Sequence, residues 1–220
     1  MYSISPELFE RQLKMLSKKF KIISVQELVE RIRSNNLGKE DYATVTFDDG
    51  LEDNYTNAFP ILQKLSIPAT IFIITDLIGK VHTNPSGFES RFISWEHARS
   101  LCDSGLVSIE SHTHTHPYLT TIPNQAIQRE VSNSKSLIKK ELGHVSKILA
   151  YPKGDFDERV IKNICPTIDA AFGPSGVLLK GEQCDVYAIP RVILSKKIGL
   201  VKYYALLHPI SWRIKRLCCK

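Results

Sequence analysis

The chain has 220 residues, 43% of them hydrophobic and 24% charged, a composition that suits one globular domain with a sizeable core. No apolar run approaches the ~18–20 residues that a membrane-spanning helix needs. The formal net charge of +6 comes from residues 196–220, which hold seven basic residues and no acidic one, so the rest is nearly neutral and shows no nucleic-acid-binding surface.

Helix and strand signals alternate along the chain. Pro6, after Ser5, predicts the first turn of a helix that runs to Phe20, and a short strand follows over 21–23. Ser24 predicts the N-cap of the next helix, with Glu27 completing a capping box. The other predicted elements are a strand over 42–47, a helix over 53–65, a strand over 69–74, a loop over 76–93, a helix from Ser94 to Gly105, a strand over 106–110, a helix capped by Asn124 and running to Gly143, a strand over 147–151, a helix over 157–164, and strands over 168–172 and 186–189.

Repeated strand–helix units with apolar strands are typical of an α/β fold whose parallel sheet is covered by helices. The number of units favours a barrel over an open sheet. No G-x-G-x-x-G sequence follows the first strand, which argues against a dinucleotide-binding fold. We expect one domain over 1–195 and a basic amphipathic tail over 196–220.

Two adjacent carboxylates, Asp48 and Asp49, follow an apolar strand and precede Gly50. Sites in parallel α/β folds are built at the C-terminal ends of the strands. Neighbouring strand residues point in opposite directions, so one carboxylate can face a metal while the other faces the reacting water. Asp-Asp-Gly is also common in turns, and this motif alone leaves a solvated turn as an equal alternative.

A pair of histidines, His112 and His116, favours the metal site. An extended chain would separate them by about 13 Å, whereas a single helical turn ending before Pro117 would bring their Cβ atoms to about 5–6 Å. Catalytic zinc takes three protein ligands and leaves a position for a water whose pKa falls to near neutral. Asp49, His112 and His116 fit that number, and His114 between them is expected to be a polar loop residue.

These motifs resemble those of the polysaccharide deacetylases, also called the NodB-homology domain, and most closely the poly-N-acetylglucosamine deacetylases. Thr46–Gly50 is similar to the first family motif, Ser111–His116 to the second and Ile148–Gly154 to the third. The likeness extends from about Ser5 to Ile193. It implies an α/β fold with a distorted (β/α)7-type barrel, and hydrolysis of an N-acetyl group on an amino sugar.

The resemblance also implies residue roles. Asp48 would be the general base, and Asp49, His112 and His116 would hold a divalent metal. Zn²⁺ suits this ligand set, although cobalt, nickel and iron accept the same ligands. A backbone N–H near Tyr151 would help to hold the oxyanion, and Tyr151 and Pro152 would wall the sugar site. A strand end turned by Pro and Gly explains those two residues equally well.

The sequence departs from the family pattern at two places. Ala150 stands where many members carry an arginine that orients the base; Arg191 could replace it in space or could be a surface arginine. The second departure concerns the general acid, which many members supply as a histidine in a late Leu-x-His motif. Leu206-Leu207-His208 resembles this motif only superficially. The Tyr-His motif near the N-terminus of the poly-N-acetylglucosamine subfamily has no counterpart. A shortened N-terminus, another acid (His82 or His97) and loss of catalysis all remain open.

The leading interpretation is a metal-dependent N-deacetylase acting on an N-acetylated glycan or its precursor. An amidohydrolase for another linear amide and a non-catalytic glycan-binding pseudoenzyme are the alternatives. The basic tail could lie on an anionic membrane surface, but a terminal helix packed on the domain is favoured. No signal peptide is visible after Met1, so we expect a cytoplasmic protein as the sequence stands, and a membrane-peripheral or exported one if the start lies upstream. The five cysteines include no C-x-x-C pair and predict reduced thiols.

Overall fold

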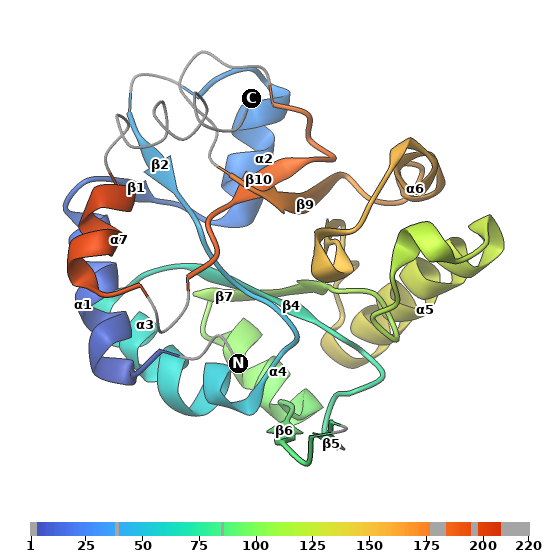
Figure 1. Ribbon diagram of the computed structural model, residues 1–220, viewed down its shortest axis with the longest axis horizontal. Coiled ribbons are helices and arrows are strands. Elements are labelled where there is room, and N and C mark those ends of the chain that lie inside the picture. Colours follow the sequence, from blue (N-terminus) through green and yellow to red (C-terminus); the bar gives the residue numbers. More distant parts are fainter. Residues whose placement is uncertain (1–3, 38–39, 85, 177–183, 195–197, 208–220) are drawn as a thin grey trace.

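Six parallel strands form a curved central sheet in the computed structural model, which describes residues 4–37, 40–84, 86–176, 184–194 and 198–207 (Figure 1). The strand order is β10-β9-β8-β7-β4-β3. The strands are β3 (Val45–Phe47), β4 (Ala69–Ile73), β7 (Val107–Ser111), β8 (Ile148–Ala150), β9 (Ala170–Ser175) and β10 (Ile189–Arg191). Because all of them are parallel, their C-terminal ends lie at the same edge of the sheet.

Helices cover both faces of this sheet. Within β4, Ile71 and Ile73 belong to a core cluster with helices on one face, while Phe72 between them packs on the other face. Five helices pack on the first face: α1 (Pro6–Ser17), α3 (Phe59–Leu65), α4 (Trp95–Asp103), α5 (Asn124–Leu142) and α6 (Glu158–Ile164). Helix α2 (Val25–Arg33) lies on the other face, where its buried Val25 and Val29 join the cluster that contains Phe72.

The curvature brings the two edge strands of the sheet together. Asp48, directly after β3, forms an ion pair with Arg191 of β10, although the sheet order places four other strands between them. The expected α/β fold with a distorted barrel is therefore confirmed. The C-terminal edge of this barrel carries Asp48, Asp49 and His112 on the loops that leave β3 and β7.

Two segments differ from their predicted structure. The predicted strand over 42–47 is divided: β2 (Tyr42–Ala43) pairs with β1 (Lys21–Ile22) in a separate sheet, and only β3 joins the main sheet. The predicted loop over 76–93 contains an antiparallel hairpin of β5 (Val81–Thr83) and β6 (Glu89–Arg91). Its side chains are mostly exposed, so the hairpin lacks the alternation of apolar and polar residues that marks a half-buried strand.

Several predicted helix ends also shift. The Ser24 hydroxyl accepts from the Glu27 N–H, but the Glu27 carboxylate pairs with Arg31, so only half of the capping box forms. The residue that caps α5 is Pro123, and Asn124 is the first helical residue. The predicted helix over 53–65 begins with a π-helical segment, η1 (Asn54–Ala58), before α3. The last two predicted strands lie two to three residues further along the chain.

The first part of the basic tail packs on the domain. Helix α7 (Leu200–Leu206) lies beside α1, with Tyr203 buried and the Lys19 ammonium 4.8 Å from the centre of the Tyr204 ring (Figure 1). Residues 195–197 and 208–220, with most of the basic side chains, lie outside the described residues. Within the described part of the chain, no helix has the length and apolar content needed to cross a membrane. The described cysteines, Cys102, Cys165 and Cys184, are free.

Candidate metal centre and active site

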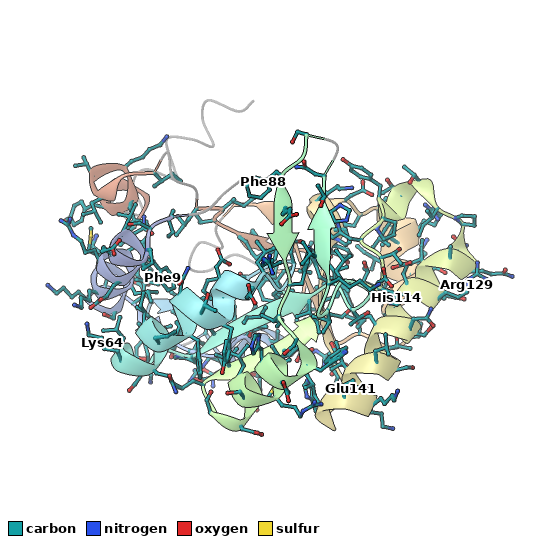
Figure 2. The ribbon with its side chains drawn as sticks, turned by 90° about the horizontal axis from the view of Figure 1, so that it is seen from below. Phe9, Lys64, Phe88, His114, Arg129 and Glu141 are labelled. Atoms are coloured by element: carbon teal, nitrogen blue, oxygen red, sulfur yellow. The ribbon has the colours of Figure 1, made fainter. Side chains whose placement is uncertain are left out.

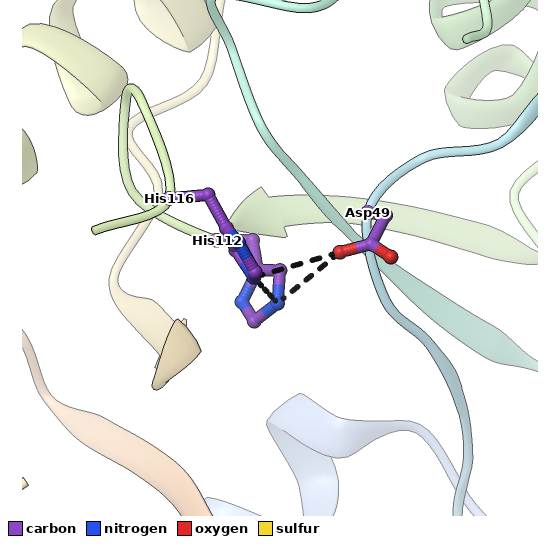
Figure 3. A group of neighbouring side chains, drawn as sticks. All are labelled: Asp49, His112 and His116. Atoms are coloured by element: carbon purple, nitrogen blue, oxygen red, sulfur yellow. Dashed lines mark hydrogen bonds and ion pairs between the residues drawn. The ribbon is translucent and has the colours of Figure 1, made fainter. Parts of the chain in front are cut away.

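Three side chains converge at the C-terminal edge of the sheet: Asp49, His112 and His116 (Figure 3). The Asp49 Oδ1 atom lies 3.5 Å from His112 Nε2 and 3.7 Å from His116 Nε2, and the two Nε2 atoms are 3.2 Å apart. Tetrahedral zinc with bonds of about 2.0–2.1 Å holds its ligand atoms about 3.3 Å from one another. The three donor atoms therefore fit one ion of this size, and the predicted ligands are brought together.

A hydrogen bond from the second ring nitrogen, Nδ1, fixes the orientation of the His112 ring. Its side chain is buried, and Nδ1 lies 2.7 Å from the Ala150 carbonyl oxygen at the end of β8. Since a carbonyl only accepts, Nδ1 carries the proton and the Nε2 lone pair points toward Asp49 and His116. Burial also lowers the pKa of His112, an effect larger than the opposing attraction of Asp48. The Nδ1 proton gives the tautomer that a metal requires, and burial favours the neutral imidazole.

The two histidines converge through a bend and not through the predicted helical turn. His112 follows β7 directly, and the chain then reverses with left-handed backbone angles at Thr113 (φ 68°) and His116 (φ 62°). The Thr113 hydroxyl accepts from the His116 N–H at 3.1 Å and closes the bend. Pro117 explains the difference, because a proline disfavours the helical conformation at the preceding residue.

Asp49 reaches the histidines because β3 ends in a tight turn. Asp49 (φ 69°) and Gly50 (φ 79°) both adopt left-handed angles. A Cβ atom on Gly50 would lie only 2.9 Å from Ile73 Cγ2, so both the backbone angle and the limited space favour glycine. Burial raises the pKa of Asp49, and the attraction of His112 opposes that rise.

Asp48 does not join the three ligands. Arg191 donates to it through Nη1 to Oδ1 (2.6 Å) and Nη2 to Oδ2 (2.9 Å). The guanidinium lies 5.7 and 6.0 Å from the ring centres of Phe72 and Phe172, which limit its movement. Burial acts to raise the pKa of Asp48, but the attraction of His112 and Arg191 outweighs it, and the net effect holds this pKa below its usual range.

A cavity of about 1760 Å³ opens over these groups and is lined by Asp48, Asp49, His112, His116 and Arg191. The β5–β6 hairpin contributes His82 and Phe88 to its wall. Figure 2 shows Phe88 on this hairpin, which projects from the domain. A segment that the sequence predicted to be a loop therefore borders the cavity over the candidate metal centre.

The structure does not bring Tyr151 and Pro152 to this cavity. Both are buried, and neither lines it. The Tyr151 ring stacks on Phe156 at 4.5 Å and its hydroxyl donates to the Tyr187 carbonyl, so it is a core residue. Its N–H donates to the Phe172 carbonyl, so this N–H is already used in the sheet.

Lys153 lines the cavity instead, a residue that the sequence reasoning did not single out. It has a left-handed backbone (φ 58°), and its ammonium lies 3.7 Å from the centre of the Tyr118 ring. The half-exposed Tyr118 follows the histidine pair closely in sequence. A lysine within the Tyr-Pro-Lys-Gly segment is the one sequence signal that could have pointed to this pair.

Four other histidines lie within the described residues, and one of them, His144, does not line the cavity and has its Nε2 atom 2.8 Å from the Ile109 carbonyl oxygen. His82 is exposed and lines the cavity. His97 stacks on Tyr55 at 4.2 Å and accepts from the Ser94 N–H at the start of α4, so it has a structural role. His114 Nδ1 lies 3.0 Å from the Thr75 hydroxyl, away from the ligand pair, as expected for a polar loop residue. His208 lies outside the described residues.

The chain is similar in sequence to a family of known proteins. Residues 35–165 match the sequence profile of the family described as polysaccharide deacetylase. YxkH of Bacillus subtilis is 31% identical over 155 residues, which cover 70% of this chain and 52% of that protein. The chain therefore spans about half the length of YxkH. The poly-beta-1,6-N-acetyl-D-glucosamine N-deacetylase of Staphylococcus aureus is 28% identical over 207 residues, covering 88% of this chain and 68% of that enzyme.

The fold is shared with solved structures. IcaB from Ammonifex degensii superimposes with a TM-score of 0.82 at 22% identity, covering 94% of this chain and 90% of that one. At this identity the match establishes the distorted barrel alone. The matched segment 35–165 contains Asp48, Asp49, His112 and His116, whereas Arg191 lies beyond it.

Proposed function

Because the chain belongs to the polysaccharide deacetylase family, we propose that it is a metal-dependent N-deacetylase acting on a glycan with N-acetylated amino sugars. One observation carries this proposal: two adjacent carboxylates have different partners. Asp49 faces the histidine pair, and Asp48 faces Arg191. This arrangement supplies a metal centre and a separate ionised base, the two groups that amide hydrolysis requires.

The metal centre consists of Asp49 and the two histidines. The ligand spacing supports a small divalent cation, and the nitrogen and oxygen donors suit zinc. A cation bound there supplies Lewis acidity toward the amide carbonyl and lowers the pKa of water. The protein contributes neutral imidazoles, the Nδ1–H bond from His112 to Ala150, and a bend that directs both Nε2 atoms toward Asp49.

Asp48 is proposed to act as the general base. It accepts a proton from the attacking water, whose oxygen forms a bond to the acetyl carbon, and the C–N bond then breaks. Arg191 is a positioning residue in this scheme, because its two parallel hydrogen bonds fix the plane of the carboxylate and favour its ionised form. The products are acetate and a glycan with a free amine.

The departing amine needs a proton, for which His82 is the proposed source. Of the described histidines that line the cavity, only His82 lies outside the ligand pair. Changing His82 to Gln should lower kcat by about 10²–10⁴ if it is the acid. A kcat equal to that of the wild type would exclude His82 as the general acid. Asp48, protonated in the first step, would then donate the proton to the amine.

The S. aureus relative acts, by its name, on a β-1,6-linked polymer of N-acetylglucosamine, and we propose a substrate of the same class. The test is acetate release from β-1,6-linked and β-1,4-linked N-acetylglucosamine oligomers and from a linear amide without a sugar. Release from the β-1,6 oligomers alone supports the proposal. Release only from the non-sugar amide would indicate an amidohydrolase. Stoichiometric zinc without release from any of them would indicate a glycan-binding pseudoenzyme.

For the basic tail we make a second proposal, peripheral contact with an anionic membrane. Four of its seven basic residues, Arg213, Lys215, Arg216 and Lys220, follow α7 in the sequence. Pelleting with phosphatidylserine vesicles compares the full chain with one ending at Leu207, which keeps α7 on α1. Binding of the full chain alone supports the proposal, and the same soluble fraction for both proteins would discard it.

A further inference from the structure

A single carboxylate on the outer helix α5 holds the loop that carries both histidine ligands. Glu130 Oε2 accepts from the backbone N–H groups of His114 (2.9 Å) and Thr115 (2.7 Å). Its Oε1 accepts from the Thr115 hydroxyl at 2.7 Å. Figure 2 shows His114 beside the helix from which Arg129 projects outward. One side chain thus satisfies three donors at the middle of the bend between His112 and His116.

This bend needs external support. Thr113 and His116 both have left-handed backbone angles, which non-glycine residues hold only where surrounding contacts determine them. The N-terminal side of the bend is held by the Ser111 hydroxyl, which accepts from the Thr113 N–H at 3.1 Å and contacts Ser134 of α5 at 2.8 Å. The middle of the bend is held by Glu130.

We propose that Glu130 is a positioning residue for the metal centre, an inference that rests on the proposed metal site. Its carboxylate contacts no ligand side chain. It fixes the backbone between the two ligands. The Nε2 atoms of His112 and His116 therefore stay 3.2 Å apart before a metal binds. Without the Glu130 carboxylate, the N–H groups of His114 and Thr115 lose their acceptor. Water can accept from these groups, but it does not fix the conformation of the bend. The affinity for the metal then falls because ordering the bend must accompany binding.

The test measures the zinc dissociation constant by competition with a chromophoric chelator, without substrate. Glu130→Ala should weaken zinc binding by about 10–100-fold, the usual effect of losing a residue that orients metal ligands. Arg129→Ala, next to it on the exposed face of α5, is the matched control and should bind zinc as the wild type does. Glu130→Gln should fall between them, because its carbonyl oxygen still accepts from both N–H groups and its amide can donate to Thr115.

Thermal unfolding of each zinc-free variant separates positioning from general stability. Zinc affinity that stays at the wild-type level in Glu130→Ala, with only a lower Tm, would overturn the proposal. If Glu130→Ala does not fold, Glu130→Gln carries the test, and wild-type affinity in that variant counts against the proposal. A wild type that binds zinc but releases no acetate would reject the proposed deacetylase while leaving the role of Glu130 intact.

Discussion

Arg191 and Asp48 meet through two parallel hydrogen bonds, Nη1 to Oδ1 at 2.6 Å and Nη2 to Oδ2 at 2.9 Å, across 143 residues of sequence. One belongs to β10 and the other follows β3, the two edge strands of the sheet. The pair therefore joins the edges of the barrel and also acts to lower the pKa of the candidate base. The position of the Asp48 carboxylate therefore depends on the closure of the fold.

Removing the guanidinium should change the pH dependence of the reaction. In Arg191→Met, burial continues to raise the pKa of Asp48 while the attraction of Arg191 is lost, so Asp48 becomes protonated at a higher pH than in the wild type. We expect the acid limb of the kcat/KM profile to move to higher pH. The plateau value of kcat/KM should also fall, by part of the ~10²–10⁴-fold rate increase that a positioned base contributes. Arg191→Lys keeps the charge but not the fork, so its acid limb should stay nearer that of the wild type. A superimposable profile for Arg191→Met would contradict the assigned role.

Metal removal should lower the free energy of unfolding only in proteins that keep the three candidate ligands. Zinc at 100 times its dissociation constant adds about 2.7 kcal/mol to the free energy of unfolding. His116→Ala should lose this stabilisation, measured as the change in Tm on adding a chelator. His114→Ala is the matched control in the same bend, because His114 contacts Thr75 and not the ligand set, and it should keep the zinc-dependent shift. Equal shifts in all three proteins would place the metal elsewhere.

The stability of the zinc-free protein should fall on acidification. Burial lowers the folded-state pKa of His112 and His116 from the ordinary 6.5. Below pH 6.5 the unfolded chain therefore binds protons that the folded protein resists, and the free energy of unfolding decreases as the pH falls through that value. Urea unfolding at pH 7.5 and 5.5 measures the effect. His112→Gln should show a smaller loss between the two pH values, and an unchanged loss would assign it to other groups.

Gly50 offers a test of how Asp49 is positioned. Gly50→Ala imposes a left-handed alanine, at about 1–2 kcal/mol, and a Cβ atom 2.9 Å from Ile73 Cγ2, which adds about 1–3 kcal/mol of overpacking. Gly79 has a similar angle (φ 74°), but a Cβ atom there would meet no heavy atom within 4 Å, so Gly79→Ala isolates the cost of the angle. We expect urea unfolding to show the larger loss for Gly50→Ala, together with weaker zinc binding. Equal losses would show that Ile73 does not constrain the turn.

The candidate ligand set could be predicted from the sequence because its signals are local. Asp49 follows an apolar strand, and the spacing of His112 and His116 limits how they can converge. The predicted helical turn was wrong because Pro117 and two left-handed residues favour a bend. Hydrogen bonds that the bend donates to Glu130 of α5 stabilise it. Spacing alone does not distinguish these two ways of bringing histidines together.

Longer-range features could not be read in the same way. Arg191 could be named as a candidate but not separated from a surface arginine, since its pairing with Asp48 depends on the curvature of the whole sheet. The Tyr-Pro segment predicted a strand end correctly, yet which side chain faces the cavity depends on packing: Phe156 and Tyr187 bury Tyr151, and Lys153 is exposed. Glu130 gave no signal because acidic residues on helices are usually solvated.

The most direct measurement is acetate release and zinc content on the same sample, for the wild type and for Asp48→Asn. Asp48 is expected to act on the reaction and not on the metal, because Arg191 holds it apart from the three candidate ligands. We predict that Asp48→Asn loses about 10²–10⁴ in rate while retaining one zinc per chain. Undiminished acetate release, or a loss of activity accompanied by an equal loss of zinc, would contradict the division of roles between Asp48 and Asp49.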